Sequence, residues 1–333
     1  MNRTRTVKRI ISCMITLALT AFFLHKISSV FVPKDTIDCK CQNELFYSLP
    51  KNSVEVIIYG SSHAYRGINP RELYEKYGIG SFNSAWNWQK IDTTRMFIED
   101  SFDYQKPRVI LIEAFNAGEV KENADPGSEI FTSKYIRNDR SRREYLRNAF
   151  GTNFKSYVGY YFPVLILHDN WSSLTKEDFG ELEISDSFRS RMGFIYTDGV
   201  TRLEIPDYKT FQQYALSDDA KYQLDKIVSL CNKNGVKIVF FTNPYSGEYN
   251  YHDAMTKYAE ENGCAYLDLF ERYDEVGFDG EADFSDSGHL NMYGANKTAD
   301  YLGAFLKENY ELTDFRQIKD NLWQRSFYGD SYE

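Results

Sequence analysis

Cysteine is scarce in this chain and follows no pattern. Among the 333 residues there are five cysteines, and their spacing is irregular. An odd and irregular set excludes a disulfide-stapled scaffold and a cysteine-based zinc framework. Internal repeats and low-complexity segments are also lacking. At this length the chain can bury a substantial core, as one large domain with or without insertions.

Acidic residues are absent from positions 1–34, which carry six cations, whereas residues 35–333 sum to a formal charge of −15. Binding to nucleic acid depends on cations that neutralise phosphate, so a body this acidic is a poor nucleic-acid partner. We therefore expect no nucleic-acid binding, and the basic N-terminus needs another explanation.

A long apolar run supplies that explanation. Four cations (Arg3, Arg5, Lys8 and Arg9) precede the span Ile10–Val32, which contains 23 residues. As a helix this span is about 35 Å long, enough for a hydrocarbon core of about 30 Å. The flanking cations predict a cytoplasmic N-terminus and an extracytoplasmic body. No small-x-small cleavage site follows the run, which favours an uncleaved, single-pass signal anchor over a cleaved signal peptide.

Strand-like segments, the first of them a run of β-branched residues, alternate with helical patterns along most of the remaining chain. The predicted strands are Val54–Tyr59, Ile79–Asn83, Arg108–Ala114, Val236–Thr242 and Ala265–Leu269. The predicted helices are Asn69–Tyr77, Gln89–Phe102, Tyr208–Asn232, Tyr251–Asn262 and Asn291–Glu308. This alternation predicts an α/β fold with a five-stranded, mainly parallel sheet.

The α/β domain is expected to occupy residues 54–312, with a largely helical insertion at 118–205, where the alternation stops. Residues 1–34 would hold the basic tail and the membrane helix. We interpret residues 35–53 as a polar linker that lifts the domain off the membrane, and residues 313–333 as a polar, aromatic tail.

Two short motifs carry residues capable of chemistry. Gly60-Ser61-Ser62-His63 follows the first strand, and Asp286-Ser-Gly-His289 lies in a predicted loop before the last helix. The glycine indicates a sharp turn at the carboxyl end of the strand, where open α/β sheets place their sites. Serine is a weak nucleophile until a base takes its proton, and a histidine oriented by a carboxylate is such a base. The plainer alternative is that Ser62 only forms a turn and Asp286 only a loop.

The two motifs give the chain a resemblance, over about residues 54–310, to the SGNH (GDSL-type) hydrolase superfamily. Gly60-Ser61-Ser62 resembles its first block, usually Gly-Asp-Ser, and Asp286-Ser-Gly-His289 its last, Asp-x-x-His. More closely, Gly60-Ser61-Ser62-His63 with a single N-terminal anchor resembles the extracytoplasmic relatives that accompany membrane-bound O-acyltransferases in teichoic-acid D-alanylation and alginate acetylation. The resemblance implies a three-layer α/β/α, flavodoxin-like core, with Ser62 as nucleophile, His289 as base and Asp286 as its orienter.

The same resemblance implies an oxyanion hole made by three donors. These are the backbone N–H of Ser62, a glycine N–H from a second block and an asparagine side chain from a third. The second block should fall within residues 83–89, which contain no glycine, so Asn87 or Trp88 would supply a backbone N–H. Asn116 follows the third strand and matches the third block, although a plain loop asparagine is equally compatible with its position.

Several neighbouring side chains complete the predicted site. With Asp286 and His289, His63 would make a metal site, but no H-x-x-x-H spacing or cysteine ligand supports one, and we expect neither metal nor cofactor. Support of the catalytic loop is the preferred role for His63. Contacts to substrate or support of the site are expected from Arg66, Trp88, Gln89 and Asn291.

These features together predict a membrane-anchored, extracytoplasmic serine esterase or O-acyltransferase. Its substrate would be an acyl ester, most simply an acetyl ester, of a cell-surface glycan or glycolipid. One alternative is a non-catalytic protein that docks on a membrane-bound O-acyltransferase and positions glycan, which the missing glycine and the large insertion favour. Another is a lipid esterase working at the membrane face.

Overall fold

The computed structural model describes residues 3–32, 39–134, 136–180, 184–247 and 249–329. The chain divides into two compact units. We call the first the anchor unit; it comprises Met1–Cys41, Glu122–Tyr135 and Leu146–Glu183. The second, the α/β unit, comprises Gln42–Lys121, Ile136–Tyr145 and Ile184–Glu333. The start of the predicted linker (35–38) and the end of the predicted tail (330–333) lie outside the described residues.

Five parallel strands form the central sheet of the α/β unit, in the order β2-β1-β3-β5-β7. They are β1 (Val56–Tyr59), β2 (Ser81–Asn83), β3 (Val109–Glu113), β5 (Lys237–Thr242) and β7 (Ala265–Asp268). The predicted α/β fold and its five strands are therefore confirmed. Because β1 pairs with β2 on one side and β3 on the other, its carboxyl end opens between two neighbouring strand ends.

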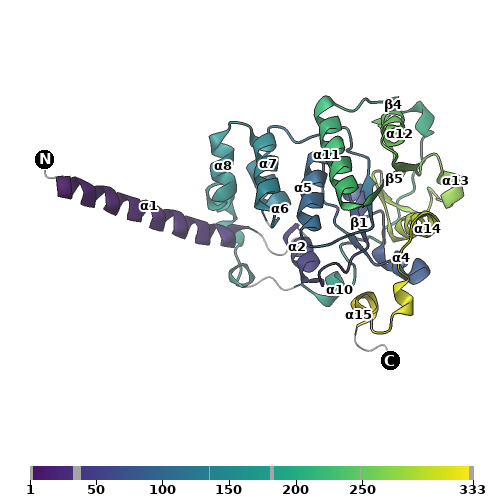
Figure 1. Cartoon of the computed structure of the whole chain (residues 1–333), viewed down its shortest axis with the longest axis horizontal. Coiled ribbons are helices and arrows are strands. Elements are labelled where there is room, and N and C mark those ends of the chain that lie inside the picture. Colours follow the sequence, from purple (N-terminus) through teal and green to yellow (C-terminus); the bar gives the residue numbers. More distant parts are fainter. Residues whose placement is uncertain (1–2, 33–38, 135, 181–183, 248, 330–333) are drawn as a thin grey trace. The chain divides into compact units, whose positions relative to one another are not determined.

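Helices cover both faces of this sheet, as Figure 1 shows. On one face, side chains such as Val56 and Leu111 pack in a core with Leu73 and Leu302. These last two belong to α4 (Pro70–Tyr77) and α14 (Met292–Asn309). Alternate strand residues point to opposite faces, so the neighbouring positions face the other layer.

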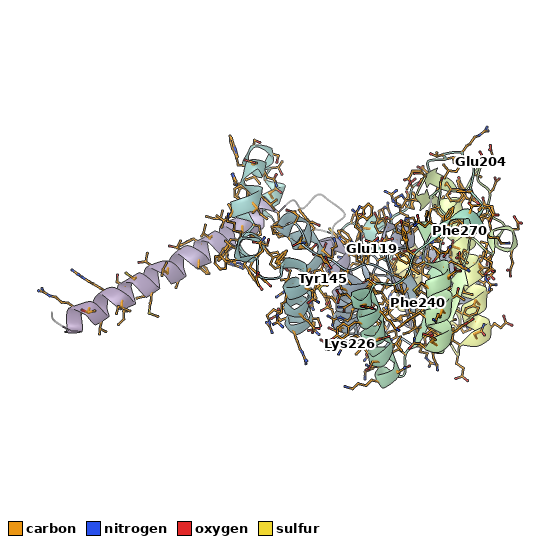
Figure 2. All side chains as sticks on the ribbon, turned by 90° about the horizontal axis from the view of Figure 1, so that it is seen from above. Glu119, Tyr145, Glu204, Lys226, Phe240 and Phe270 are labelled. Atoms are coloured by element: carbon orange, nitrogen blue, oxygen red, sulfur yellow. The ribbon has the colours of Figure 1, made fainter. Side chains whose placement is uncertain are left out.

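The second layer consists of α5 (Ile91–Phe102), α11 (Asp218–Asn234) and α12 (His252–Glu261). Tyr59 of β1 shares a hydrogen bond with Ser101 of α5. Phe240 of β5 packs edge-on against Tyr258 of α12. In Figure 2, Phe240 lies inside the unit while Lys226 of α11 projects from its exterior. Burial of both sheet faces explains the nearly continuous apolar strands.

The third predicted helix begins later than expected. Instead of starting at Tyr208, α11 starts at Asp218, where the Oγ of Ser217 accepts a hydrogen bond from the N–H of Ala220 at 3.1 Å. The preceding residues form a 3-10 turn, η3 (Tyr208–Thr210), and the short strand β4 (Gln212–Gln213), which pairs with β6 (Tyr249–Asn250). A serine cap followed by two acidic residues is a stronger start signal than the apolar periodicity that extended the prediction.

The polar tail, and the predicted linker from Gln42 onward, belong to the α/β unit. Residues 39–48 form α2 (Cys39–Ser48), whose Leu45 and Phe46 are buried. The tail forms η4 (Phe315–Gln317) and α15 (Leu322–Tyr328), and Trp323 is fully buried. In both segments a few large apolar side chains outweigh a polar average composition, because burying each one stabilises the fold by about 1.5–3 kcal/mol.

The predicted insertion is mostly helical but belongs to two units. The anchor unit contains α1 (Arg3–Phe31), α6 (Pro126–Ser133), α8 (Phe154–Tyr161), α9 (Val164–Leu167), η1 (His168–Ser173) and η2 (Glu177–Phe179). Helix α7 (Asp139–Phe150) is divided between the two units, and α10 (Asp186–Arg189) lies in the α/β unit. Outside the insertion, the α/β unit also contains the short helix α13 (Tyr273–Val276). Over Arg5–Phe31, α1 is long and apolar enough to cross a membrane, although a signal sequence has the same properties.

Candidate active site

The turn after β1 presents Ser62 at the carboxyl edge of the sheet. Gly60 has a φ of +141°, and a Cβ built on it would lie 2.5 Å from the Cβ of Glu113. Only glycine fits this backbone conformation and this close approach. Ser61 then caps the short helix α3 (Ser62–Tyr65), its Oγ accepting the N–H of His63 at 3.3 Å. The cap places Ser62 at the first helical position.

The segment with Asp286 and His289 is a hairpin rather than the predicted loop. The strands β8 (Phe284–Asp286) and β9 (His289–Leu290) pair antiparallel, with Asp286 opposite His289. The turn is closed by the N–H of Gly288, which donates to Asp286 Oδ1 at 2.9 Å. Opposed positions in an antiparallel pair carry their side chains on the same face, so the pairing brings carboxylate and imidazole together.

The structure brings Ser62, His289 and Asp286 into one hydrogen-bonded chain. His289 Nε2 lies 2.7 Å from Ser62 Oγ, and His289 Nδ1 lies 2.7 Å from Asp286 Oδ1. With the Nδ1–H donated to the carboxylate, Nε2 is free to accept the serine proton. This is the geometry of a nucleophile, a general base and the group that orients the base.

Burial keeps the imidazole of His289 neutral. Burial lowers the pKa of His289 below its usual value, and the opposing contribution of Asp286 does not fully offset it. Partial burial raises the pKa of Asp286, but the hydrogen bonds from Gly288 and His289 and the charge of Arg66 outweigh it, so the pKa lies below the ordinary aspartate value. Arg66 Nη1 is 3.2 Å from Asp286 Oδ2. At neutral pH the site therefore holds a neutral base beside an ionised carboxylate.

His63 packs beneath the site. Its ring stacks on Phe115 at 4.0 Å between centroids and lies 5.2 Å from the ring of His289. Burial, and next the charge of His289, lower the pKa of His63 to about 3, so the ring stays neutral. Across the described ranges, no group of three or more His, Cys, Asp and Glu side chains is arranged to hold a metal ion. The contacts of His63 are those of a supporting side chain.

Gln89 and Asn291 make structural contacts. Gln89 is buried, and its Nε2 donates to Thr94 of α5 at 2.9 Å. Asn291 is fully buried and caps α14, its Oδ1 accepting the N–H of Tyr293 at 2.9 Å. Its Nδ2 donates to the carbonyl of Ala282 at 2.6 Å. Asn291 therefore ties the hairpin to the last helix and has no surface for substrate.

The segment predicted to complete an oxyanion hole lies against the nucleophile turn. The N–H of Trp86 donates to the carbonyl of Gly60 at 3.0 Å. Two residues later Trp88 has a φ of +50°, with its indole 63% exposed, and Asn87 is exposed as well. A left-handed conformation is rare for a bulky side chain and is a form of backbone strain often found at functional sites. Asn116 is buried, and its Nδ2 donates to the carbonyl of Gln89 at 3.4 Å.

Sequence reasoning missed Glu113, a buried carboxylate at the end of β3. Its Oε2 accepts the hydroxyl of Ser61 at 3.0 Å, and its Oε1 accepts the N–H of Phe115 at 2.7 Å. Burial raises the pKa of Glu113 to about 7, against the hydrogen bonds from Phe115 and Ser61. Ser61, which replaces the aspartate of the resembled motif, thus contacts a carboxylate from the next strand. The sequence signal for Glu113 was an acidic residue at the end of the apolar run Val-Ile-Leu-Ile.

Tyr65 is the second residue that the sequence did not single out. It is buried, and Ser62 and Arg66 lie near enough to influence the pKa of its hydroxyl. Burial raises the pKa of Tyr65, so its hydroxyl stays protonated at neutral pH. Its position three residues after Ser62, on the same face of one helical turn, was the available signal.

Fold and site together define an α/β protein with a Ser–His–Asp arrangement at the carboxyl edge of its sheet. No protein-family model and no curated protein matches the chain. Among solved structures it is similar to a Bacteroides fragilis protein described as an acylhydrolase, at 12% identity over 80% of this chain and 94% of that one, with a TM-score of 0.39.

Two further structures are similar to a comparable degree. A Desulfitobacterium hafniense protein described as a lipolytic protein of the G-D-S-L family is 12% identical over 75% of this chain and 97% of that one, with a TM-score of 0.36. An α/β hydrolase from the metagenome of Lake Arreo is 13% identical over 78% and 95%, also with a TM-score of 0.36. These scores are too low to assign a family or an activity.

Proposed function

We propose that this protein is a serine esterase or O-acyltransferase of the SGNH type. The observation that carries the proposal is the hydrogen-bonded chain from Ser62 Oγ through His289 to Asp286, with 2.7 Å at each link. Two segments far apart in sequence contribute its members: a glycine turn and a serine cap position Ser62, and one hairpin positions both Asp286 and His289. A serine whose only role was to form a turn would not need a neutral imidazole oriented by a carboxylate beside its hydroxyl.

The proposed reaction has two halves. His289 Nε2 takes the proton of Ser62 while Oγ forms a bond to the acyl carbonyl carbon, which gives a tetrahedral oxyanion. Its collapse breaks the ester bond, and His289 returns the proton to the departing alcohol oxygen. Water or a sugar hydroxyl then loses its proton to His289 and attacks the acyl-serine, and Ser62 is regenerated with its proton. Asp286 stabilises the imidazolium formed in each half.

The oxyanion would be stabilised by donors around the turn. The N–H of Ser62 lies at the start of α3, and the predicted partners are the side chain of Asn116 and a backbone N–H of Asn87 or Trp88. Removing one such donor typically costs about 10²–10³-fold in kcat. The left-handed backbone of Trp88 supports this assignment, because it is a conformation that a glycine would adopt without strain.

The proposed substrate is an acyl ester, most simply acetyl, on a cell-surface glycan or glycolipid outside the membrane that α1 spans. The cations before the apolar part of α1 favour this topology. The site is open: the Asp286 side chain is 47% exposed, and the Trp88 indole is free to contact a sugar face. A membrane-bound O-acyltransferase is the proposed partner where the reaction is transfer.

Labelling with a fluorophosphonate probe tests the proposal. When the full chain in detergent is incubated with the probe, its ester turnover should fall in proportion to the fraction labelled. Peptide mapping should place the adduct on Ser62 and not on the adjacent Ser61. Ser62→Ala should abolish both labelling and turnover, while His289→Ala should lower both strongly. Full activity of Ser62→Ala would exclude the serine mechanism.

A non-catalytic glycan-binding role is the second candidate. Residues 83–89 contain no glycine, and this departure from the resembled pattern favours it. The same probe separates the two proposals. If wild-type protein takes up no fluorophosphonate yet binds acetylated glycan, and Ser62→Ala binds it equally well, the binding role holds and the enzymatic role fails.

A further inference from the structure

The C-terminal end of α1 is built into the anchor unit. Ser28 is fully buried, and its Oγ accepts the N–H of Val164, at the start of α9, at 3.2 Å. The carbonyl of Phe31 accepts Asn170 Nδ2 at 3.2 Å. A signal peptide is removed from the mature chain, whereas this helix supplies hydrogen-bond partners to segments more than a hundred residues away. The packing therefore favours a retained helix.

An apolar groove opens between α1 and α8. It has a volume of about 490 Å³, and its walls include Ala21 and His25 of α1 with Phe154, Tyr161 and Phe162. Figure 1 shows α8 near the end of α1 that is away from the marked N-terminus. Large apolar patches exposed on a protein usually mark an interaction site, and this groove continues onto the exposed apolar surface of α1.

Exposed aromatic side chains surround this region of the unit. Phe154 at the start of α8 is 77% exposed, and Trp171 in η1 is 71% exposed. Leu165 of α9 is also exposed, beside the polar His168 and Asp169. Tryptophan next to charged groups on an apolar surface is typical of the membrane–water interface.

The position of the groove along α1 indicates what kind of molecule it holds. The apolar run starts at Ile10, and at about 1.5 Å per residue Ala21 and His25 lie roughly 17–23 Å further along the helix. A hydrocarbon core of about 30 Å therefore reaches past both residues. Any helix that packs beside them must also meet lipid.

We infer that the anchor unit is partly immersed in the outer leaflet, with a lipid acyl chain in the groove between α1 and α8. Trp171 then lies at the level of the headgroups, and Phe154 and Leu165 contact acyl chains. This inference rests on the membrane placement in the proposed function but not on the ester chemistry. Continuity with the lipid-facing surface of α1 favours a lipid over a protein as the occupant.

Fluorescence quenching in nanodiscs tests the inference. The full chain is placed in phosphatidylcholine nanodiscs with or without bromine on the acyl chains, which quenches tryptophan on contact. Part of the wild-type emission should be quenched by bromolipid. That part should disappear in Trp171→Phe and persist in the matched control Trp88→Phe, which removes a similarly exposed indole (63%) from the α/β unit. Adding Tyr161→Trp to Trp171→Phe should restore quenching from inside the groove.

The outcomes separate this inference from the proposed function. Intact mass shows whether α1 is retained; its loss would overturn both the anchor and the immersed unit. If α1 is retained but Trp171 is quenched by aqueous iodide and not by bromolipid, the surface faces water or a protein partner, and the inference alone fails. Labelling of Ser62 is unaffected in either case.

Discussion

His289 Nε2 lies 2.7 Å from Ser62 Oγ, although 227 residues separate them in sequence. The contact forms because β1 is an inner strand of the parallel sheet, between β2 and β3, and the β8–β9 hairpin precedes α14, which packs with α4 on one face of that sheet. The carboxyl edges of open α/β sheets are where sites of this kind are assembled. The charges near the contact lead to a prediction about pH.

The activity should have an acidic limit controlled by His289 and tuned by Arg66. The proposed mechanism requires the base form of His289, and the pKa of His289 is lowered, first by burial, so kcat/KM should fall only as the pH drops through a value below 6.5. Arg66 lowers the pKa of both His289 and Asp286. In Arg66→Met the acidic limit should therefore move to higher pH, while the plateau falls less than the ~10²-fold that loss of a general base costs.

The measurement is kcat/KM against pH for a small acetyl ester. Arg71→Met is the matched control, since Arg71 is exposed on α4 and pairs with Glu75 at 2.7 Å. Its profile should match that of the wild type. An acidic limit that stays in place in Arg66→Met would contradict the electrostatic account of the site.

Glu113 should make stability depend on pH. Its folded pKa of about 7 lies above its ordinary value of 4.5, so the folded state binds the extra proton. Its contribution to stability is complete below pH 4.5 and is lost as the pH rises through about 7. At about 1.4 kcal/mol per pKa unit this difference is on the order of 3 kcal/mol. In Glu113→Gln the decline in unfolding free energy between pH 5 and 8 should be smaller.

Urea unfolding at pH 5 and pH 8 measures this effect. The control is Glu308→Gln, which removes an exposed carboxylate from the last turn of α14; it should keep the wild-type decline. The assignment fails if Glu113→Gln and the control respond to pH alike.

Gly60 should tolerate no side chain. Gly60→Ala places a Cβ 2.5 Å from that of Glu113, on a backbone with φ +141°. Overpacking and backbone strain together should destabilise the fold by about 3–5 kcal/mol. Gly235, which ends α11 with φ +69° and has nothing within 4 Å of the position that a Cβ would take, is the matched control. Gly235→Ala should cost only about 1 kcal/mol; equal losses in urea unfolding would refute the steric account.

Trp88→Gly should separate the backbone of this residue from its side chain. Glycine adopts φ +50° without strain, so stability should be unchanged or rise by about 1 kcal/mol. Hydrolysis of a small acetyl ester should persist, because the backbone N–H remains. Turnover of an acetylated glycan should fall by about 10-fold, the effect of losing roughly 1.4 kcal/mol of aromatic contact with the sugar. Parallel loss on both substrates would show that the indole itself supports the site.

Local sequence patterns predicted the elements that local physics determines. Short apolar segments bounded by breaks predicted the five strands within two residues at each end, and Asn69, Pro70 and Gly78 predicted the bounds of α4. These signals act over a few residues through backbone preference and capping. The same kind of signal at Ser217 was present but was outweighed by apolar periodicity, so the start of α11 was placed too early.

The sequence by itself determined that a serine ends the first strand, that an Asp-x-x-His motif precedes the last helix and that an apolar helix begins the chain. Only the tertiary structure decided that Ser62 and His289 meet, that Glu113 supports Ser61, and that a supposed linker and tail are buried. Each of these depends on which strands are neighbours and on what covers them. Such contacts are set by packing between distant segments, and a local pattern of residues does not encode them.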